Sequence, residues 1–267
     1  MMAAPNILVI KFGGHAMSDN DGAFGKKLAS AVAQGLQVVV VHGGGPQINA
    51  ALKSAGIEST FIGGFRVTTP ETFEIVERVL SNEVGPEVAS TLTKSGVAAL
   101  AISGRHSGTI FAKRQKTLVN GESADLGLVG EVEKVDPTAI EVLLEKGVVP
   151  VISPVANDLE SSGGLNVNAD IAAAAVAGAL SAKELIIMTD VPGIYRNWPD
   201  KDSLIDAICS EELESIKATF AEGMAPKVQA CLDAIKAGAT AVRIIDGTNP
   251  SALKDALLGV GGTLVVA

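Results

Sequence analysis

The sequence contains little cysteine, no excess of basic residues and no long apolar run. Its two cysteines, Cys209 and Cys231, lie far apart and outside any CxxC pattern, which argues against a disulfide scaffold or a zinc site. No apolar run reaches the length of about 18 residues needed to cross a membrane, and the first residues do not form a secretory signal. We therefore expect a cytoplasmic protein without a membrane partner.

The charge balance excludes further classes of protein. The 267 residues include 30 acidic and 21 basic side chains, which gives a net charge of −9. Such a chain has no overall positive field to attract nucleic acid or anionic lipid, so we expect no nucleic-acid partner. A hydrophobic content of 47% argues against disorder. If the ligand is an anion, local groups must hold it against the overall charge.

Short apolar runs alternate along the chain with segments of helical periodicity. The runs contain much Val and Ile and little polar alternation, and they cover residues 7–10, 38–41, 97–102, 148–152, 185–188, 241–245 and 264–266. This pattern predicts an α/β fold, a three-layer αβα sandwich around a mostly parallel central sheet. Residues 72–80 predict a helix that Pro70 begins. Residues 109–135 break the rhythm and predict antiparallel ribbon strands.

A lysine and two glycines follow the first apolar run. Lys11 ends the predicted strand and is followed by Phe12, Gly13 and Gly14. Open α/β sheets bind ligands at the carboxyl ends of their strands, where glycines let backbone N–H groups approach an anion and a lysine supplies positive charge. The segment is either part of an anion site or a turn with a solvated lysine.

The second apolar run ends in His42, which three glycines and Pro46 follow. Successive glycine N–H groups at the start of a helix can bind an anion. The spacing matches neither the dinucleotide-binding nor the P-loop motif. We favour anion binding over a flexible connector, and we expect His42 to be a hydrogen-bonded core residue rather than a catalytic base.

Polar side chains also gather in two later segments. Arg66 follows two glycines and fits a bidentate contact with a carboxylate, although a surface arginine is the alternative. Asn166, Asn168 and Asp170 crowd at the start of an alanine-rich helix, where one residue is enough for a cap. The surplus favours a ligand site, in which Asp170 can orient lysines without taking a proton.

The last two candidate segments lie in the C-terminal third. Thr189 and Asp190 follow an apolar run and fit either a nucleotide contact or a stabilised turn. Lys227 stands near the start of a predicted helix over residues 228–237, where a cation opposes the helix dipole. An anionic ligand explains that position better than helix stability does.

In this order, the motifs resemble those of the amino acid kinase family, and within it those of the acetylglutamate kinases. The matching segments are Lys11–Gly14, His42–Pro46, Phe65–Thr68, Asn166–Asp170, Thr189–Val191 and Gly223–Lys227. The resemblance extends over nearly the whole chain. The opening lysine and glycines are shared across the wider family, whereas the later asparagine–aspartate and Gly-Met-x-Pro-Lys motifs are more specific.

The resemblance implies that ATP phosphorylates the γ-carboxylate of N-acetyl-L-glutamate in arginine biosynthesis. It implies that Lys11 and Lys227 neutralise the transferring phosphoryl group while Asp170 holds both lysines. The residues that it assigns to the acceptor are Gly44, Gly45, Arg66 and Asn166, and those that it assigns to ATP are Gly13, Gly14, Thr189 and Asp190. Because no acidic pair forms an obvious metal cage, we expect Mg²⁺ to arrive with ATP rather than at a metal site of the protein.

The resemblance also implies an N-terminal lobe for the amino acid, residues 1–180, and a C-terminal lobe for ATP, residues 181–267. Residues 245–250 lack the histidine of arginine-inhibited relatives, and few residues precede the first strand, so we expect an arginine-insensitive homodimer. The helix over residues 72–80 is a candidate interface, or its apolar face is internal. The alternatives are a kinase for carrier-linked aminoadipate or aspartate and a non-catalytic nucleotide or amino-acid sensor.

Overall fold

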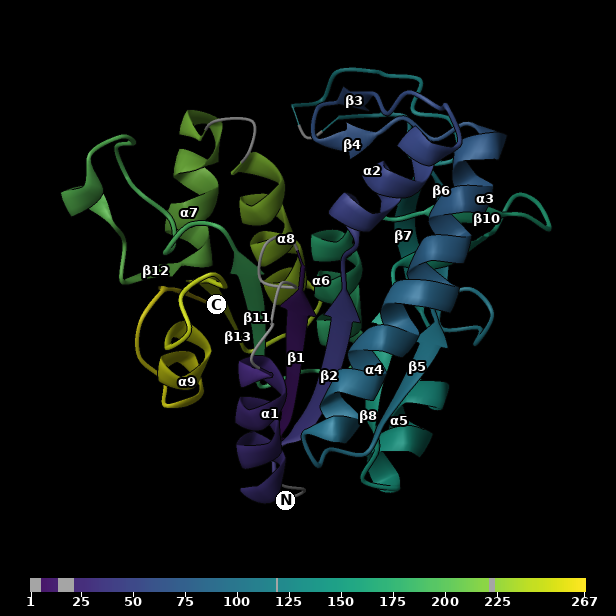
Figure 1. Cartoon of the computed structure of the whole chain (residues 1–267). Helices are drawn as coiled ribbons and strands as arrows, with labels where there is room; N and C mark the ends of the chain where they lie inside the picture. Colours follow the sequence, from purple (N-terminus) through teal and green to yellow (C-terminus); the bar gives the residue numbers. More distant parts are fainter. Residues whose placement is uncertain (1–5, 14–21, 119, 221–223) are drawn as a thin grey trace.

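The computed structural model describes residues 6–13, 22–118, 120–220 and 224–267, and a central sheet of eight strands runs through it (Figure 1). In order across the sheet, the strands are β12 (Ala207–Cys209), β14 (Thr263–Val266), β13 (Ala241–Asp246), β11 (Glu184–Thr189), β1 (Ile7–Phe12), β2 (Gln37–His42), β8 (Val149–Ser153) and β5 (Ala99–Ser103). Every neighbouring pair is parallel except β13 and β14. The predicted mostly parallel sheet is confirmed.

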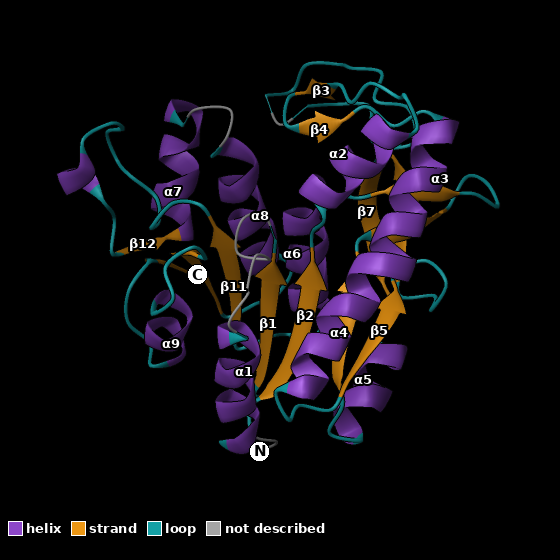
Figure 2. Cartoon of the chain, viewed as in Figure 1, coloured by secondary structure: helices purple, strands orange, loops and turns teal. Residues whose placement is uncertain are grey.

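Helices cover both faces of this sheet (Figure 2). The side chains of the strands alternate between two cores. Along β1, Val9 belongs to one core and Ile10 to the other. The helices on the side of Val9 are α5 (Thr138–Glu145), α6 (Ala169–Ala179), α7 (Ser210–Ile216) and α8 (Ala225–Lys236). Those on the side of Ile10 are α1 (Ala23–Ala33), α2 (Gly45–Ser54), α3 (Pro70–Arg78), α4 (Gly85–Lys94) and α9 (Ala252–Leu257). The architecture is the predicted αβα sandwich.

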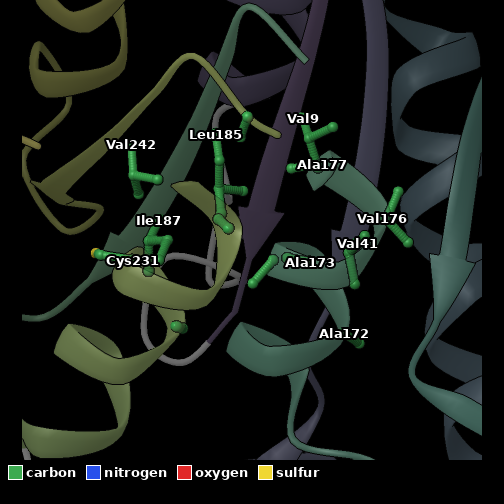
Figure 3. Close-up of a cluster of buried hydrophobic side chains, with 14 of the residues drawn as sticks. Val9, Val41, Ala172, Ala173, Val176, Ala177, Leu185, Ile187, Cys231 and Val242 are labelled. Atoms are coloured by element: carbon green, nitrogen blue, oxygen red, sulfur yellow. The ribbon is translucent and has the colours of Figure 1, made fainter. Parts of the chain in front are cut away.

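Helix α6 packs against the middle of the sheet through small side chains (Figure 3). Ala172, Ala173 and Ala177 are fully buried in the same core as Val9 and Leu185. Small residues allow a helix to lie close to its neighbours, and the interior stays densely packed. The start of α6 is therefore held close to the end of β1.

Shorter strands lie beyond the carboxyl ends of β1 and β2. A second sheet contains β10 (Gly164–Asn166), β9 (Val155–Asp158), β6 (Ile110–Arg114) and β7 (Gly130–Val135), and a hairpin joins β3 (Phe61–Ile62) to β4 (Phe65–Arg66). The antiparallel pair of β6 and β7 confirms the predicted ribbon. Two 3₁₀ turns, η3 (Lys201–Ser203) and η4 (Lys217–Thr219), lie near α7 in the chain.

The predicted helix over residues 72–80 is α3, and it continues further than expected. Thr69 caps it through its hydroxyl, and Pro70 occupies the first turn. At Val79 it passes into a π-helical segment, η2 (Val79–Val84), which leads into α4. Phe73 and Val76 are buried within the chain, so the apolar face of α3 is internal. Among the described residues, no helix combines the length and apolar character required to span a membrane.

Candidate active site

Polar turns meet where three adjacent parallel strands end. Lys11 lies in register with Val41 of β2 and Ile187 of β11, and Phe12 lies beside His42. The segments after β1, β2 and β11 therefore converge at the carboxyl edge of the sheet, where open α/β folds bind ligands.

Asp170 contacts two lysines that come from different elements. Its Oδ1 lies 2.9 Å from Lys11 Nζ, and its Oδ2 lies 3.5 Å from Lys227 Nζ. Burial acts to raise the pKa of Asp170, but the two ammonium groups outweigh it and hold the pKa below its ordinary value. The carboxylate is ionised at neutral pH and fixes both lysines.

The position of Asp170 follows from how α6 begins. Asn168 is the N-cap, and its Oδ1 accepts hydrogen bonds from the N–H groups of Asp170 at 2.8 Å and Ile171 at 3.4 Å. An acidic residue in the first turn also suits the helix dipole. Because the alanines of α6 lie against β1, its start brings the carboxylate to Lys11.

Lys227 reaches the same carboxylate from the first turn of α8. Helices α6 and α8 approach closely, since a Cβ on Gly178 would lie only 2.3 Å from Ala237 Cβ. A lysine at a helix N-terminus is unfavourable by roughly 0.3–1 kcal/mol when exposed. Its contact with Asp170 offsets this cost and directs the ammonium group toward the sheet edge.

The glycine turns after β1 and β2 lie against each other and the lysine. A Cβ on Gly13 would lie 3.2 Å from Lys11 Nζ and 3.5 Å from Gly43 Cα. A Cβ on Gly44 would lie 2.6 Å from Leu80 Cδ2, so this position has no room for a side chain. Gly45 begins α2, and the space beside it is open. Gly14 lies outside the described residues.

Arg66 and Asn166 are joined by a chain of hydrogen bonds through Thr68. The Asn166 amide donates to the Thr68 hydroxyl at 3.1 Å, and that hydroxyl donates to the Arg66 carbonyl at 2.8 Å. The Arg66 guanidinium donates to Ser59 and lies 4.6 Å above the centre of the Phe61 ring. Ring and hydroxyl together fix the direction of the guanidinium.

These residues line one pocket together with the glycine turn. The pocket has a volume of about 150 Å³ and is lined by Gly43, Gly44, Gly45, Arg66 and Asn166, with apolar walls from Ile48, Phe61, Leu80 and Val129. It therefore combines backbone donors, a cation and apolar surface. That combination suits a small carboxylic acid with an apolar substituent.

A larger cavity adjoins Lys227 on the side of β11. Its volume is about 670 Å³, and its lining includes Asp190, Tyr195, Trp198, Phe220 and Met224. The Thr189 hydroxyl donates to Asp190 Oδ1 at 3.0 Å, which links the end of β11 to this cavity. Aromatic and thioether side chains beside a lysine and a carboxylate suit a planar base with a charged tail.

Sequence reasoning did not identify two residues that shape the site. Thr68 is completely buried between Arg66 and Asn166, and Phe61 supports the guanidinium. Thr68 stands in the segment that carries Arg66, so its place two residues away was a usable signal. No pattern in the sequence pointed to Phe61, because its contact with Arg66 depends on the hairpin of β3 and β4.

The described part of the chain contains neither a metal-binding cluster nor a disulfide. Within the described ranges, no three His, Cys, Asp or Glu side chains gather in a way that could hold a metal ion. Cys209 is exposed and Cys231 is buried, and both are free thiols.

Known proteins resemble this chain in sequence over most of its length. The model of the amino acid kinase family matches residues 6–246. An acetylglutamate kinase of Paenarthrobacter aurescens is 46% identical, and the match covers 94% of this chain and 83% of the relative. An acetylglutamate kinase of Kineococcus radiotolerans is 43% identical, with 97% and 90% covered.

Solved structures share the fold over the full length. The structure of smu.665 from Streptococcus mutans matches with a TM-score of 0.81 at 29% identity and covers 98% of this chain and 99% of its own. Carbamate kinase from Giardia lamblia bound to AMP-PNP matches with a TM-score of 0.72 at 19% identity, with 99% of both chains covered, which shows the fold alone. From the family match and the identities of the curated relatives, the chain belongs to the amino acid kinase family.

Proposed function

We propose that this chain transfers the γ-phosphoryl group of ATP to the γ-carboxylate of N-acetyl-L-glutamate, giving N-acetylglutamyl 5-phosphate in arginine biosynthesis. The observation that carries the proposal is the Asp170 carboxylate held between Lys11 and Lys227. Asp170 directly follows Ala169, which lines the small pocket, and Lys227 lines the larger cavity. The names of the curated relatives support this acceptor.

The reaction joins two anions, so it needs positive groups that are fixed before the reactants meet. Lys11 and Lys227 neutralise the charge on the phosphoryl oxygens during transfer. Asp170 holds the two ammonium groups in place and takes no proton. The attacking carboxylate is ionised at neutral pH, so the enzyme needs no general base for it.

The small pocket binds the acceptor. Arg66 and Asn166 hold its α-carboxylate, with Phe61 and Thr68 keeping these two groups in position. The N–H groups of Gly44 and Gly45 face the carboxylate that is phosphorylated. The apolar walls accept the acetyl group.

The larger cavity binds ATP. The aromatic side chains contact the base, and Thr189 and Asp190 contact the nucleotide at the end of β11. Gly13 and Gly14 bind phosphate oxygens through their backbone. Mg²⁺ would be held by the ATP phosphates and water rather than by the protein, because both oxygens of Asp170 already contact lysines.

The two pockets also support a division of the chain into two lobes. All lining residues of the small pocket lie within residues 1–180, and all those of the larger cavity lie within residues 181–267. Residues 1–180 form the lobe for the amino acid and residues 181–267 the lobe for ATP. We place the enzyme in the cytoplasm, where ATP is available.

A homodimer completes the proposal. Strand β5 is an edge of the central sheet, and its Leu100 side chain is 49% exposed. An unpaired edge strand with an exposed apolar side chain is suited to a second copy of the same chain. Light scattering after gel filtration should give twice the chain mass of 27.2 kDa, and Leu100→Glu should give the monomer.

The acceptor is tested by trapping the acyl phosphate. The protein is incubated with Mg-ATP and acetylglutamate, glutamate, aspartate or aminoadipate, and hydroxylamine converts any acyl phosphate to a hydroxamate. We expect product from acetylglutamate at a far higher rate than from the others. Product from another acid but not from acetylglutamate would reassign the acceptor, and product from none would favour a sensor.

A further inference from the structure

His42 is a buried polar residue that the proposed reaction does not use. It ends β2 and has no exposed surface. Its Nε2 atom is buried and has no hydrogen-bond partner among the described residues. Buried polar atoms nearly always have a hydrogen-bond partner, so an atom without one needs an explanation.

The other ring nitrogen makes a contact with the turn that follows. Nδ1 lies 2.7 Å from the carbonyl oxygen of Gly43. A carbonyl only accepts, so Nδ1 carries the proton and donates it. Burial lowers the pKa of His42 to about 4, although this hydrogen bond opposes the shift. The ring is neutral at pH 7, and Nε2 then carries no proton.

This hydrogen bond fixes the peptide unit that joins Gly43 to Gly44. In a trans peptide, the carbonyl and the following N–H point in opposite directions. With the Gly43 carbonyl turned toward the imidazole, the Gly44 N–H is directed away from the ring, and Gly43, Gly44 and Gly45 all line the small pocket. The N–H of Gly43 itself already donates to the Phe12 carbonyl at 2.8 Å.

The segment η2 and the start of α4 cover the ring from the other side. A Cβ on Gly85 would lie 3.1 Å from His42 Nε2, so the imidazole has little room to turn over. The Ser81 hydroxyl lies 2.9 Å from that of Ser153, which attaches η2 to the end of β8. Leu80 of η2 also closes over Gly44. π-helical segments are frequent at functional sites.

We propose that His42 is a positioning residue, whose Nδ1–H holds the Gly43 carbonyl so that the Gly44 N–H points at the acceptor carboxylate. The proposal rests on the proposed function, because it takes the small pocket as the acceptor site. His42 acts through Gly44 and touches no substrate. This tautomer leaves Nε2 as an acceptor, and no described residue donates a hydrogen bond to it.

Three substitutions separate the two ring nitrogens. His42→Asn keeps a donor where Nδ1 stands, His42→Gln keeps a polar group where Nε2 stands, and His42→Leu keeps neither. We expect His42→Leu and His42→Gln to lower kcat/KM for the acceptor about tenfold or more, as the loss of a well-placed hydrogen bond does. His42→Asn should recover most of this loss, and the KM for ATP should stay within about twofold in all three.

The outcomes decide the proposal on readouts that a structural role alone would not move. The positioning role is wrong if His42→Asn loses as much kcat/KM for the acceptor as His42→Leu does. It is also wrong if the KM values for ATP and for the acceptor rise together. These assays use whichever acid the wild type phosphorylates. If that acid is not acetylglutamate, the result contradicts the proposed function and leaves the role of His42 to be decided by the variants. ¹⁵N NMR of the wild type needs no turnover, and it should show His42 protonated at Nδ1; protonation at Nε2 would overturn the proposal.

Discussion

At the scale of single residues, burial and pairing decide what each charge does. Lys11 and Arg66 are among the buried polar residues although the chain as a whole is acidic. Each has a partner that fixes its direction, Asp170 for the lysine and Phe61 with Ser59 for the arginine. The electrostatics of the site are therefore local and depend on few contacts.

Asp170→Asn should lower kcat by about 10²–10³-fold, because the amide cannot hold two ammonium groups in place. The KM values for ATP and acceptor should change much less, since neither substrate contacts this side chain in the proposed arrangement. Steady-state kinetics measure both effects. Asp206→Asn, an exposed carboxylate, is the matched control; an Asp170→Asn variant as active as this control would remove Asp170 from the mechanism.

Phe61→Leu should raise the KM for the acceptor by about two- to fivefold, the size expected for a cation–π contact at a partly exposed ring. The change leaves the Arg66 charge in place and removes only its support. Phe61→Tyr retains the aromatic face and should keep the wild-type KM. Equal KM values for the Leu and Tyr variants would contradict the role of the ring.

His42 should make the stability depend on pH between 6.5 and 4. The folded pKa is lowered to about 4 from 6.5, so in this window the unfolded chain takes up a proton that the folded chain does not. The contribution of the neutral His42 to the free energy of unfolding is complete above pH 6.5. It is lost as the pH falls from 6.5 through 4, by about 3 kcal/mol in total. Chemical unfolding of wild type and His42→Asn over this range isolates the effect, and a stability difference independent of pH would refute it.

At the scale of elements, the packing of α6 sets the position of Asp170. Ala173→Leu adds bulk where the helix meets the sheet and should destabilise the fold by about 1–3 kcal/mol. It should also lower kcat, because the start of α6 moves away from Lys11. Ala179→Leu, at an exposed position of the same helix, is the control for both measurements. If Ala173→Leu loses stability but keeps its kcat, the packing of α6 does not set the position of Asp170.

The sequence predicts the elements whose patterns are local and strong. The seven apolar runs all became strands of the central sheet, those in its middle with both faces covered, and Pro70 marked the start of α3. The strands β3, β4, β9, β10 and β12 have two to four residues each, too few for a periodic pattern, and pairing with distant segments holds them. The π-helical turn of η2 left no sequence signal either, since it arises where α3 meets α4.

For the site, the sequence predicted residue types better than contacts. Lysines, glycines and Asp170 could be singled out because their positions at strand ends and helix starts are unusual. That one carboxylate contacts both lysines was implied by the family resemblance and by no spacing in the sequence, because the contact depends on how α6 packs on β1 and α8. The contact of His42 with Gly43 depends on the conformation of the turn after β2, and the enclosure by Gly85 depends on how the start of α4 packs on β2; no spacing in the sequence predicts either.

At the scale of the whole molecule, one continuous sheet connects the two proposed lobes. The neighbouring strands β1 and β11 belong to different lobes, and Lys11 at the end of β1 meets Lys227 of the other lobe through Asp170. A net charge of −9 repels anions at long range, so a substrate is attracted only near this edge of the sheet. We expect weak dependence of KM on salt compared with enzymes that attract substrates by a broad positive surface.

The most direct test compares wild type and Lys227→Ala in the hydroxylamine assay with acetylglutamate, with ATP binding measured alongside by calorimetry. The wild type should give acetylglutamyl hydroxamate. The variant should bind ATP and form product orders of magnitude more slowly, since it lacks one of two charges that stabilise the transferring phosphoryl group. No hydroxamate from the wild type, or equal rates from both proteins, would contradict phosphoryl transfer between Lys11 and Lys227.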